Sequence, residues 1–141
     1  MKRYLLFVFL LVLLLPACST RERLVEMAPD ADPDKVPNLV GEYAVNGLDP
    51  LGQEYGGRLT ISAGDQSDTY NMQWIVVGSI QEGVGVLNGN QLLVDWQSVE
   101  NSTNKSQGTA NYTVTENGEL YGTRTVDGYP KDGTEQAFPN P

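Results

Sequence analysis

The chain has 141 residues, with 9 Lys and Arg against 18 Asp and Glu, a net charge of −9, no His and a single Cys. This length holds one domain once a targeting segment is set aside, and the acidic excess disfavours nucleic acid and anionic lipid headgroups as partners. The lack of His and the single Cys exclude intrachain disulfides, Cys–His nucleophile pairs and the usual zinc sites, so we expect no metal or other cofactor.

The first seventeen residues have the organisation of a secretory signal peptide. Lys2 and Arg3 precede an unbroken apolar run, YLLFVFLLVLLL, at residues 4–15. Twelve residues rise only about 18 Å as a helix, which is short of the roughly 30 Å hydrocarbon core. The run therefore predicts a signal-peptide core rather than a membrane span. The motif that follows at residues 15–18, LPAC, resembles the lipobox of bacterial lipoproteins.

The lipobox resemblance implies that Cys18 is acylated and becomes the first residue of the mature protein. Two acyl chains anchor a protein stably to a bilayer, whereas one chain does so only marginally. Ser19 after the Cys resembles the default signal for the outer membrane, if the host has two membranes. We therefore expect a protein of the bacterial cell envelope that is attached to the lipid bilayer through Cys18.

Residues 18–38 predict a lipidated Cys followed by a flexible tether. Residues 19–38, STRERLVEMAPDADPDKVPN, have three prolines, mixed charge and no sustained periodicity, as flexible spacers do. Twenty residues at about 3.3 Å each would reach some 65 Å. The alternating carboxylates from Asp30 to Asp34 resemble the start of a calcium loop, but the Gly and Glu that such a loop needs are missing. We interpret them as solvated.

The remaining residues, 39–141, predict one all-β domain. Short runs rich in Val, Ile, Thr, Tyr and Trp alternate with glycine-containing turns, which is the signature of consecutive antiparallel strands. The clearest hairpin turns are Asn88-Gly89-Asn90 and Asn117-Gly118, because these residue types tolerate positive φ. We expect eight strands, at residues 40–46, 55–62, 69–77, 80–88, 91–98, 108–115, 119–126 and 133–138.

Alternation within these strands sorts apolar side chains to one face. A sheet that is apolar on one side must cover that side, and eight hairpin strands without a helix do so most simply by closing into an antiparallel up-and-down barrel. Its interior is filled by side chains or holds one small ligand. A sandwich of five to seven strands is the alternative. The expected inner residues are Tyr43, Val45, Leu59, Ile61, Tyr70, Met72, Trp74, Val76, Val84, Val86, Leu92, Val94, Trp96, Tyr112, Val114, Leu120 and Val126.

Glycine–aromatic motifs recur through the domain, at residues 41–43, 55–61, 70–74, 84–96 and 117–122. They resemble a broad group of small bacterial β-meander proteins, some of them labelled fibronectin-binding, and the layout is similar to that of avidin and lipocalin barrels. The resemblance implies the eight-stranded barrel and carries over no ligand residue. Two positions depart from it: Arg124 stands where the group has a Trp, and Tyr43 stands where lipocalins have one.

Four aromatic residues share the predicted inner face. Tyr70, Trp74, Trp96 and Tyr112 either fill the core or line one end of a barrel that grips an apolar or sugar-ring ligand. They are the first candidate ligand-facing residues.

Arg124 is the fifth candidate, because it has the same parity as the apolar residues of its strand. An inward Arg needs a carboxylate or an aromatic face, since an unpaired buried charge is costly. Glu135 on the last strand is the first partner that we expect, and Tyr43 is the second. A ligand carboxylate is the alternative.

Catalysis has little support in the sequence. Without His, paired carboxylates are the remaining general acid–base machinery, and the candidates, Asp65 with Asp68 and Asp95 with Glu100, fall in expected turns or on the polar face. No Ser has a Gly-x-Ser-x-Gly context. We expect no enzyme; a carboxylate-based glycan hydrolase is kept as an alternative.

The leading interpretation is an envelope-anchored lipoprotein whose non-catalytic barrel binds a small apolar ligand or a protein partner. Without the signal peptide the chain keeps seven basic and 18 acidic residues, a net charge of −11, so a cationic partner is favoured. One form of this interpretation is an acidic inhibitor of a cationic protein such as lysozyme. Binding steered by charge weakens with ionic strength, whereas apolar pocket binding does not.

Overall fold

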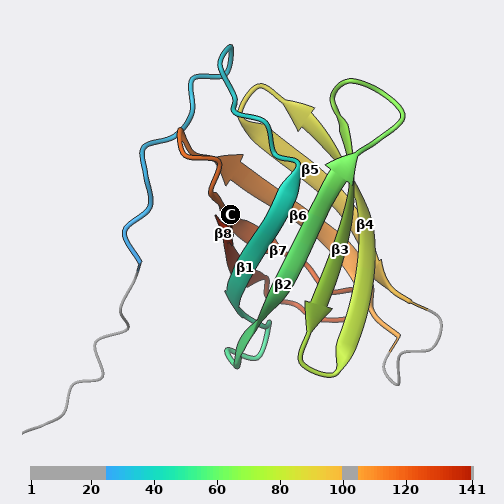
Figure 1. The fold of residues 1–141 in the computed structure, drawn as a ribbon. Coiled ribbons are helices and arrows are strands. Elements are labelled where there is room, and N and C mark those ends of the chain that lie inside the picture. Colours follow the sequence, from blue (N-terminus) through green and yellow to red (C-terminus); the bar gives the residue numbers. More distant parts are fainter. Residues whose placement is uncertain (1–24, 100–104, 141) are drawn as a thin grey trace, which may run out of the picture.

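The computed structural model describes residues 25–99 and 105–140, which form a closed barrel of eight antiparallel strands in chain order (Figure 1). The strands are β1 (Gly41–Leu48), β2 (Glu54–Ala63), β3 (Thr69–Val76), β4 (Ser79–Asn88), β5 (Gln91–Ser98), β6 (Gln107–Val114), β7 (Leu120–Arg124) and β8 (Gly133–Pro139). Every strand end lies within two residues of its predicted position. The predicted up-and-down barrel is confirmed, and the alternative sandwich is wrong.

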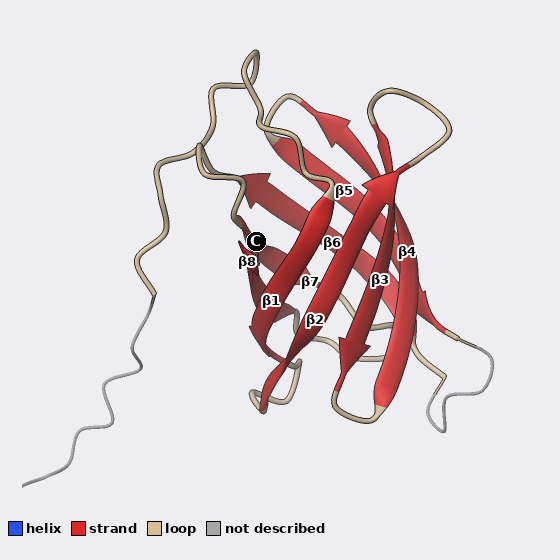
Figure 2. Ribbon diagram, in the orientation of Figure 1, coloured by secondary structure: helices blue, strands red, loops and turns tan. Residues whose placement is uncertain are grey.

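Connections of two to eight residues join the strands, and Figure 2 shows strands and loops alternating around the barrel. In the β4–β5 turn, Gly89 has a φ of 57° and takes the first central position between the paired residues Asn88 and Gln91, as in a type II′ turn. In the β6–β7 turn, Gly118 has a φ of 77° and its amide donates to the Thr115 carbonyl at 2.9 Å. Both predicted turns are confirmed.

Three predicted features fall outside the described residues. They are the signal peptide with Cys18, the first part of the tether, and Glu100 in the β5–β6 loop. Among the residues that are described, no helix is long and apolar enough to cross a membrane.

The inner face of β4 differs from the prediction. Val84 and Val86 were expected inside, but they point outward and are 54% and 45% exposed. Their neighbours Gly83 and Gly85 face the interior instead, where a Cβ on either would come within about 3 Å of Val94 or Leu92 side-chain atoms. The Gly-Val-Gly-Val sequence shows that side chains alternate between two faces, but not which face points inward, because glycine has no side chain that marks a polar face. Large side chains on β3 and β5 decide the direction by filling this space.

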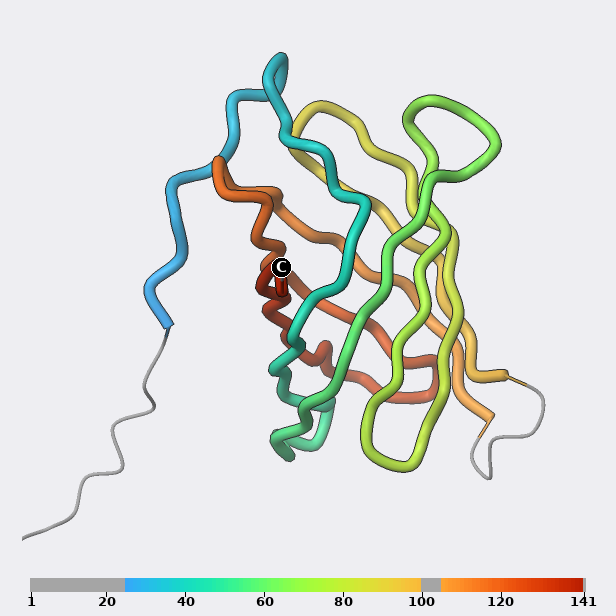
Figure 3. Tube along the Cα trace, in the orientation of Figure 1, coloured from blue at the N-terminus to red at the C-terminus, as the bar shows by residue number. Residues whose placement is uncertain are grey.

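The second half of the predicted tether lies against the barrel. We call residues 28–38 the N-terminal strap. Its main chain pairs with the β6–β7 turn: the Ala31 amide donates to the Val114 carbonyl at 2.9 Å, and the Glu116 amide donates to the Pro29 carbonyl at 2.8 Å. The Asn90 side chain donates to the Ala31 carbonyl at 2.9 Å. In Figure 3 the blue segment passes beside the orange β6–β7 turn and then bends over one end of the barrel.

The strap closes this end of the barrel with apolar side chains. Ala31 is buried, as is Leu39 directly after the strap, and Val36 packs against the core. Pro33 lies over Gly89 in the β4–β5 turn, and Pro37 lies near Gly118 in the β6–β7 turn. Residues 28–38 are therefore part of the folded domain. The prediction that they form a flexible spacer is wrong. Local composition carries no information about the distant turns to which these residues hydrogen-bond.

Adding one methyl group to the inner face of β4 should destabilise the barrel. A Cβ on Gly83 would lie 2.8 Å from the Asp95 carbonyl oxygen and 3.1 Å from the Trp74 ring. We expect Gly83→Ala to lower the free energy of unfolding by about 1–3 kcal/mol, the usual cost of overpacking. Val84→Ala on the outer face should change it by no more than about 0.5 kcal/mol. Urea unfolding of the two variants checks this, and equal losses would contradict the inner and outer assignment.

Candidate functional site

Large polar side chains alternate with glycines across the inner surface of the barrel. The register aligns Tyr55 with Gly47, Gly47 with Glu135, Glu135 with Gly122, and Gly122 with Tyr112. The Tyr55 ring covers Gly47 so closely that a Cβ there would overlap it. The glycines therefore leave the space in which the two phenols reach the carboxylate between them.

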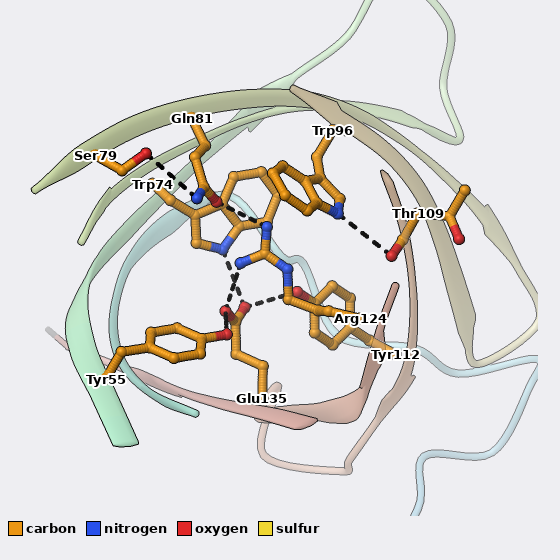
Figure 4. A network of polar contacts seen from close by, with 9 residues as sticks. All are labelled: Tyr55, Trp74, Ser79, Gln81, Trp96, Thr109, Tyr112, Arg124 and Glu135. Atoms are coloured by element: carbon orange, nitrogen blue, oxygen red, sulfur yellow. Dashed lines mark hydrogen bonds and ion pairs between the residues drawn. The ribbon is translucent and has the colours of Figure 1, made fainter. Parts of the chain in front are cut away.

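The Glu135 carboxylate is almost fully buried and accepts four hydrogen bonds (Figure 4). Its Oε1 accepts from the Tyr112 hydroxyl at 2.6 Å and from the Trp74 indole nitrogen at 3.0 Å. Its Oε2 accepts from the Tyr55 hydroxyl at 2.6 Å and from Arg124 Nη1 at 2.7 Å. A buried carboxylate is tolerated when it is paired and hydrogen-bonded in this way.

The Arg124 guanidinium lies between two indole rings. Its Cζ is 4.8 Å from the centroid of the Trp74 ring and 4.4 Å from that of the Trp96 ring, within the range of cation–π attraction. Nη1 forms the ion pair with Glu135, and Nη2 donates to the Gln81 side-chain carbonyl at 2.8 Å. Nε is buried and has no hydrogen-bond partner among the described residues.

We call these residues the inner polar network. Its members come from seven strands, β2 to β8. They are Tyr55, Trp74, Gln81, Trp96, Tyr112, Arg124 and Glu135.

Burial is the main influence on the pKa values of the network's phenols. It raises the pKa of Tyr112 well above its usual value, and the neighbouring Glu135 raises it further while Arg124 counteracts. The pKa of Tyr55 rises for the same reasons. Burial alone would lower the pKa of the Arg124 guanidinium, but the adjacent Glu135 carboxylate and the two phenols outweigh this effect and raise it. Arg124 therefore stays protonated while the phenols stay neutral.

Four of the five candidate ligand-facing residues meet in the inner polar network. Trp74, Trp96, Tyr112 and Arg124 are buried there, and each donates a hydrogen bond to a protein acceptor. Tyr70 is half-buried and packs against the core outside the network. The polar groups that the sequence assigned to a ligand are thus bonded to the protein itself.

The predicted partner of Arg124 is confirmed as Glu135. Tyr43, the second choice, instead donates its hydroxyl to the Leu39 carbonyl at 2.8 Å. Sequence reasoning missed Tyr55 and Gln81. The parity of Tyr55 with the apolar residues of its strand was a usable signal, whereas Gln81 was hidden by the wrong direction assigned to β4.

Outward side chains of β3, β4 and β5 form a second candidate site, which we call the β3–β5 wall. Ten large apolar residues are exposed in the described part of the chain, and six of them lie at residues 75–93. Ile75 pairs across strands with Ile80, and Val86 pairs with Leu93. Exposed apolar patches of this kind commonly mark interaction surfaces.

The same wall is acidic and polar. Glu82 and Asp95 stand on adjacent strands, two register positions apart, and an open hollow of about 1010 Å³ lies over them. Gln73 and Gln97 line it as well. The strands β3, β4 and β5 carry no Lys or Arg. The neighbouring Arg58 of β2, which pairs across strands with Ile75, forms an ion pair with Glu42 instead, so cationic side chains of a partner would meet carboxylates without an ion-pair partner here. Among the described residues, no cluster of three or more acidic or Cys side chains is arranged to hold a metal ion.

No model of a known protein family matches this chain, and no curated protein matches it.

Breaking the buried ion pair should cost more than breaking an exposed one. Arg124→Met leaves the Glu135 carboxylate buried without its ion-pair partner. Glu135→Gln likewise leaves the Arg124 guanidinium as a buried unpaired charge. We expect each to lower the free energy of unfolding by about 3–5 kcal/mol. Arg58→Met breaks the exposed pair with Glu42, whose closest charged atoms are 3.6 Å apart, and should cost less than about 1 kcal/mol.

The Arg124→Met, Glu135→Gln double variant should lose less stability than the sum of the two single variants, because no unpaired charge remains. Urea unfolding of the four proteins measures this coupling. Strictly additive losses would mean that the two side chains do not interact.

The barrel should lose stability in alkali as its buried phenols are forced to ionise. Burial raises the pKa of Tyr43 to about 12, and the pKa values of Tyr55 and Tyr112 are raised as well. A raised folded-state pKa contributes stability that is complete below the unfolded value of about 10 and is lost as the pH rises through the folded value. We expect phenolate absorbance from these three residues to appear only together with unfolding. Their ionisation in a barrel whose circular dichroism is still native would contradict this burial.

Proposed function

We propose that this protein is an exported lipoprotein whose barrel binds a cationic protein through the β3–β5 wall, without catalysing a reaction. The observation that carries the proposal is the combination on one wall of exposed aliphatic pairs, two carboxylates and no cation. Apolar surface supplies affinity when binding removes it from water. Opposite charge supplies orientation and a faster encounter.

Envelope attachment belongs to the proposal and rests on the sequence. Its support is the apolar run at residues 4–15 with Cys18 in a lipobox-like motif. The eight-stranded up-and-down barrel is in keeping with the lipocalin and avidin resemblance, which remains part of the proposal. An inhibitor of a cationic hydrolase such as lysozyme is one specific form that this function would take.

A small apolar ligand inside the barrel is less favoured than a protein partner. The interior groups that would orient a ligand donate to one another and to main-chain carbonyls, so a ligand would have to break these bonds without an evident gain. Glycan hydrolysis is less favoured for a related reason. The buried carboxylate, Glu135, already accepts four hydrogen bonds and is closed to solvent.

Binding to a cationic protein should depend on the wall and on salt. We expect the barrel to bind lysozyme, used as the first cationic probe, and to do so more weakly at about 300 mM than at about 50 mM salt, because screening shortens the range of charge attraction. Removing two wall charges with Glu82→Gln and Asp95→Asn should weaken binding by about tenfold, on the order of 1.4 kcal/mol. Isothermal titration calorimetry measures both effects.

The matched control changes the same net charge elsewhere. Glu116→Gln and Asp132→Asn neutralise two exposed carboxylates in loops away from the wall, and should leave the affinity within about twofold. Equal weakening by both pairs would show attraction to net charge rather than a site. If no protein in a panel of cationic proteins binds at low salt, the proposed function is wrong.

A further inference from the structure

The strap determines where the chain leaves the barrel on its way to the N-terminus. The Ala28 amide donates to the Glu119 carboxylate at 2.8 Å, and the Tyr121 hydroxyl donates to the Asp30 carboxylate at 2.7 Å. Asp30 also forms a bridge with Thr115 in the β6–β7 turn. These contacts tie the chain to β7 and to the turn before it.

From there the chain continues along the outside of the same strands. Val25 lines an open hollow together with residues of β7, β8, β1 and β2, among them Tyr121, Gln136 and Asn46, and with Val77 in the β3–β4 turn. Residue 25 therefore lies on the half of the barrel that β7, β8, β1 and β2 form, next to the β7 contacts of Ala28 and Asp30. In a closed barrel of eight strands β7 is opposite β3, and β8 is opposite β4, so this exit is on the side away from the β3–β5 wall.

The remaining chain to the expected lipid anchor is short. Six residues separate Cys18 from Val25, and the seven steps from one to the other at about 3.5 Å each reach at most about 25 Å. Eight strands about 4.8 Å apart and tilted by about 40° give a barrel about 16 Å across its backbone, or about 26 Å with its side chains. The wall could touch the bilayer only with the linking residues almost fully stretched, which opposes their conformational entropy.

The charges on the two sides of the barrel favour the same orientation as the short linker does. The outward side chains of β7 and β8, among them Thr123, Thr134 and Gln136, are uncharged, and the Asp30 carboxylate that the strap adds on this side accepts a hydrogen bond from Tyr121. The opposite wall carries Glu82 and Asp95 without a cation, and anionic headgroups repel carboxylates.

We infer that the strap orients the anchored barrel, with the β7–β8 side toward the bilayer and the β3–β5 wall away from it, open to a partner. This inference rests on the acylation of Cys18 in the proposed function. It also shortens the reach of the anchor, because residues 28–38 are held on the barrel instead of extending from it.

Energy transfer to labelled lipids tests the orientation in the full-length, lipidated protein. Acylation blocks the single native Cys, so Thr123→Cys on β7 and Gln73→Cys on β3 each give one labelling site on an exposed, opposite position. In vesicles with acceptor-labelled headgroups, we expect a donor at residue 123 to transfer at least about twofold more efficiently than one at residue 73, because the short linker keeps the β7 side near the surface. Equal or reversed efficiencies in acylated protein would overturn the inference.

A longer linker provides the control. Inserting about fifteen Gly and Ser residues between Arg23 and Leu24 should abolish the difference between the two positions, because flexible linkers of that length let the barrel turn freely. A difference that survives the insertion means that a surface of the barrel, and not the strap with its short linker, sets the orientation, and so contradicts the inference. Mass spectrometry that finds Cys18 without lipid would instead refute the proposed anchor, and the orientation with it.

Discussion

The buried Glu135 carboxylate is the group on which the interior of this barrel depends. A charge without water is unfavourable unless its hydrogen-bonding capacity is met, and here two phenols, an indole and a guanidinium meet it. The donors come from β2, β3, β6 and β7, and the acceptor comes from β8. Because no small group of neighbouring strands supplies them all, the network is complete only when the barrel is closed.

The inner and outer faces of the sheet therefore differ in chemistry. Inside, Arg124 and Glu135 neutralise each other and the aromatic rings fill the remaining space, with inner glycines such as Gly47 and Gly83 making room. On the outside, the β3–β5 wall combines aliphatic and acidic side chains, and the binding that we propose uses this surface. The strap holds the N-terminal chain on the β7 side of the barrel. The β3–β5 wall lies on the opposite side.

Much of the fold and part of the site could be predicted from local pattern. Alternation and turn residues located all eight strands, and parity with an apolar strand face placed Arg124 inside and paired it with Glu135. The sequence could not predict which face of β4 points inward, since Gly-Val-Gly-Val allows either its glycines or its valines to face the interior. The choice depends on the large side chains of β3 and β5 that fill the space next to it. Composition also suggested a free spacer at residues 28–38, although these residues bind the barrel end through main-chain atoms, which composition does not report.

By itself, the sequence determined the strand count, the tight turns and the presence of an inward Arg, because each follows from the geometry of a few consecutive residues. The tertiary structure alone decided that the aromatic residues and Arg124 bond to one another and to Glu135, that valines of β4 face solvent, and that the strap covers one end. These outcomes depend on distances between strands that are far apart in the chain. Tyr55 and Glu135, for example, are 80 residues apart and yet 2.6 Å from hydroxyl to carboxylate.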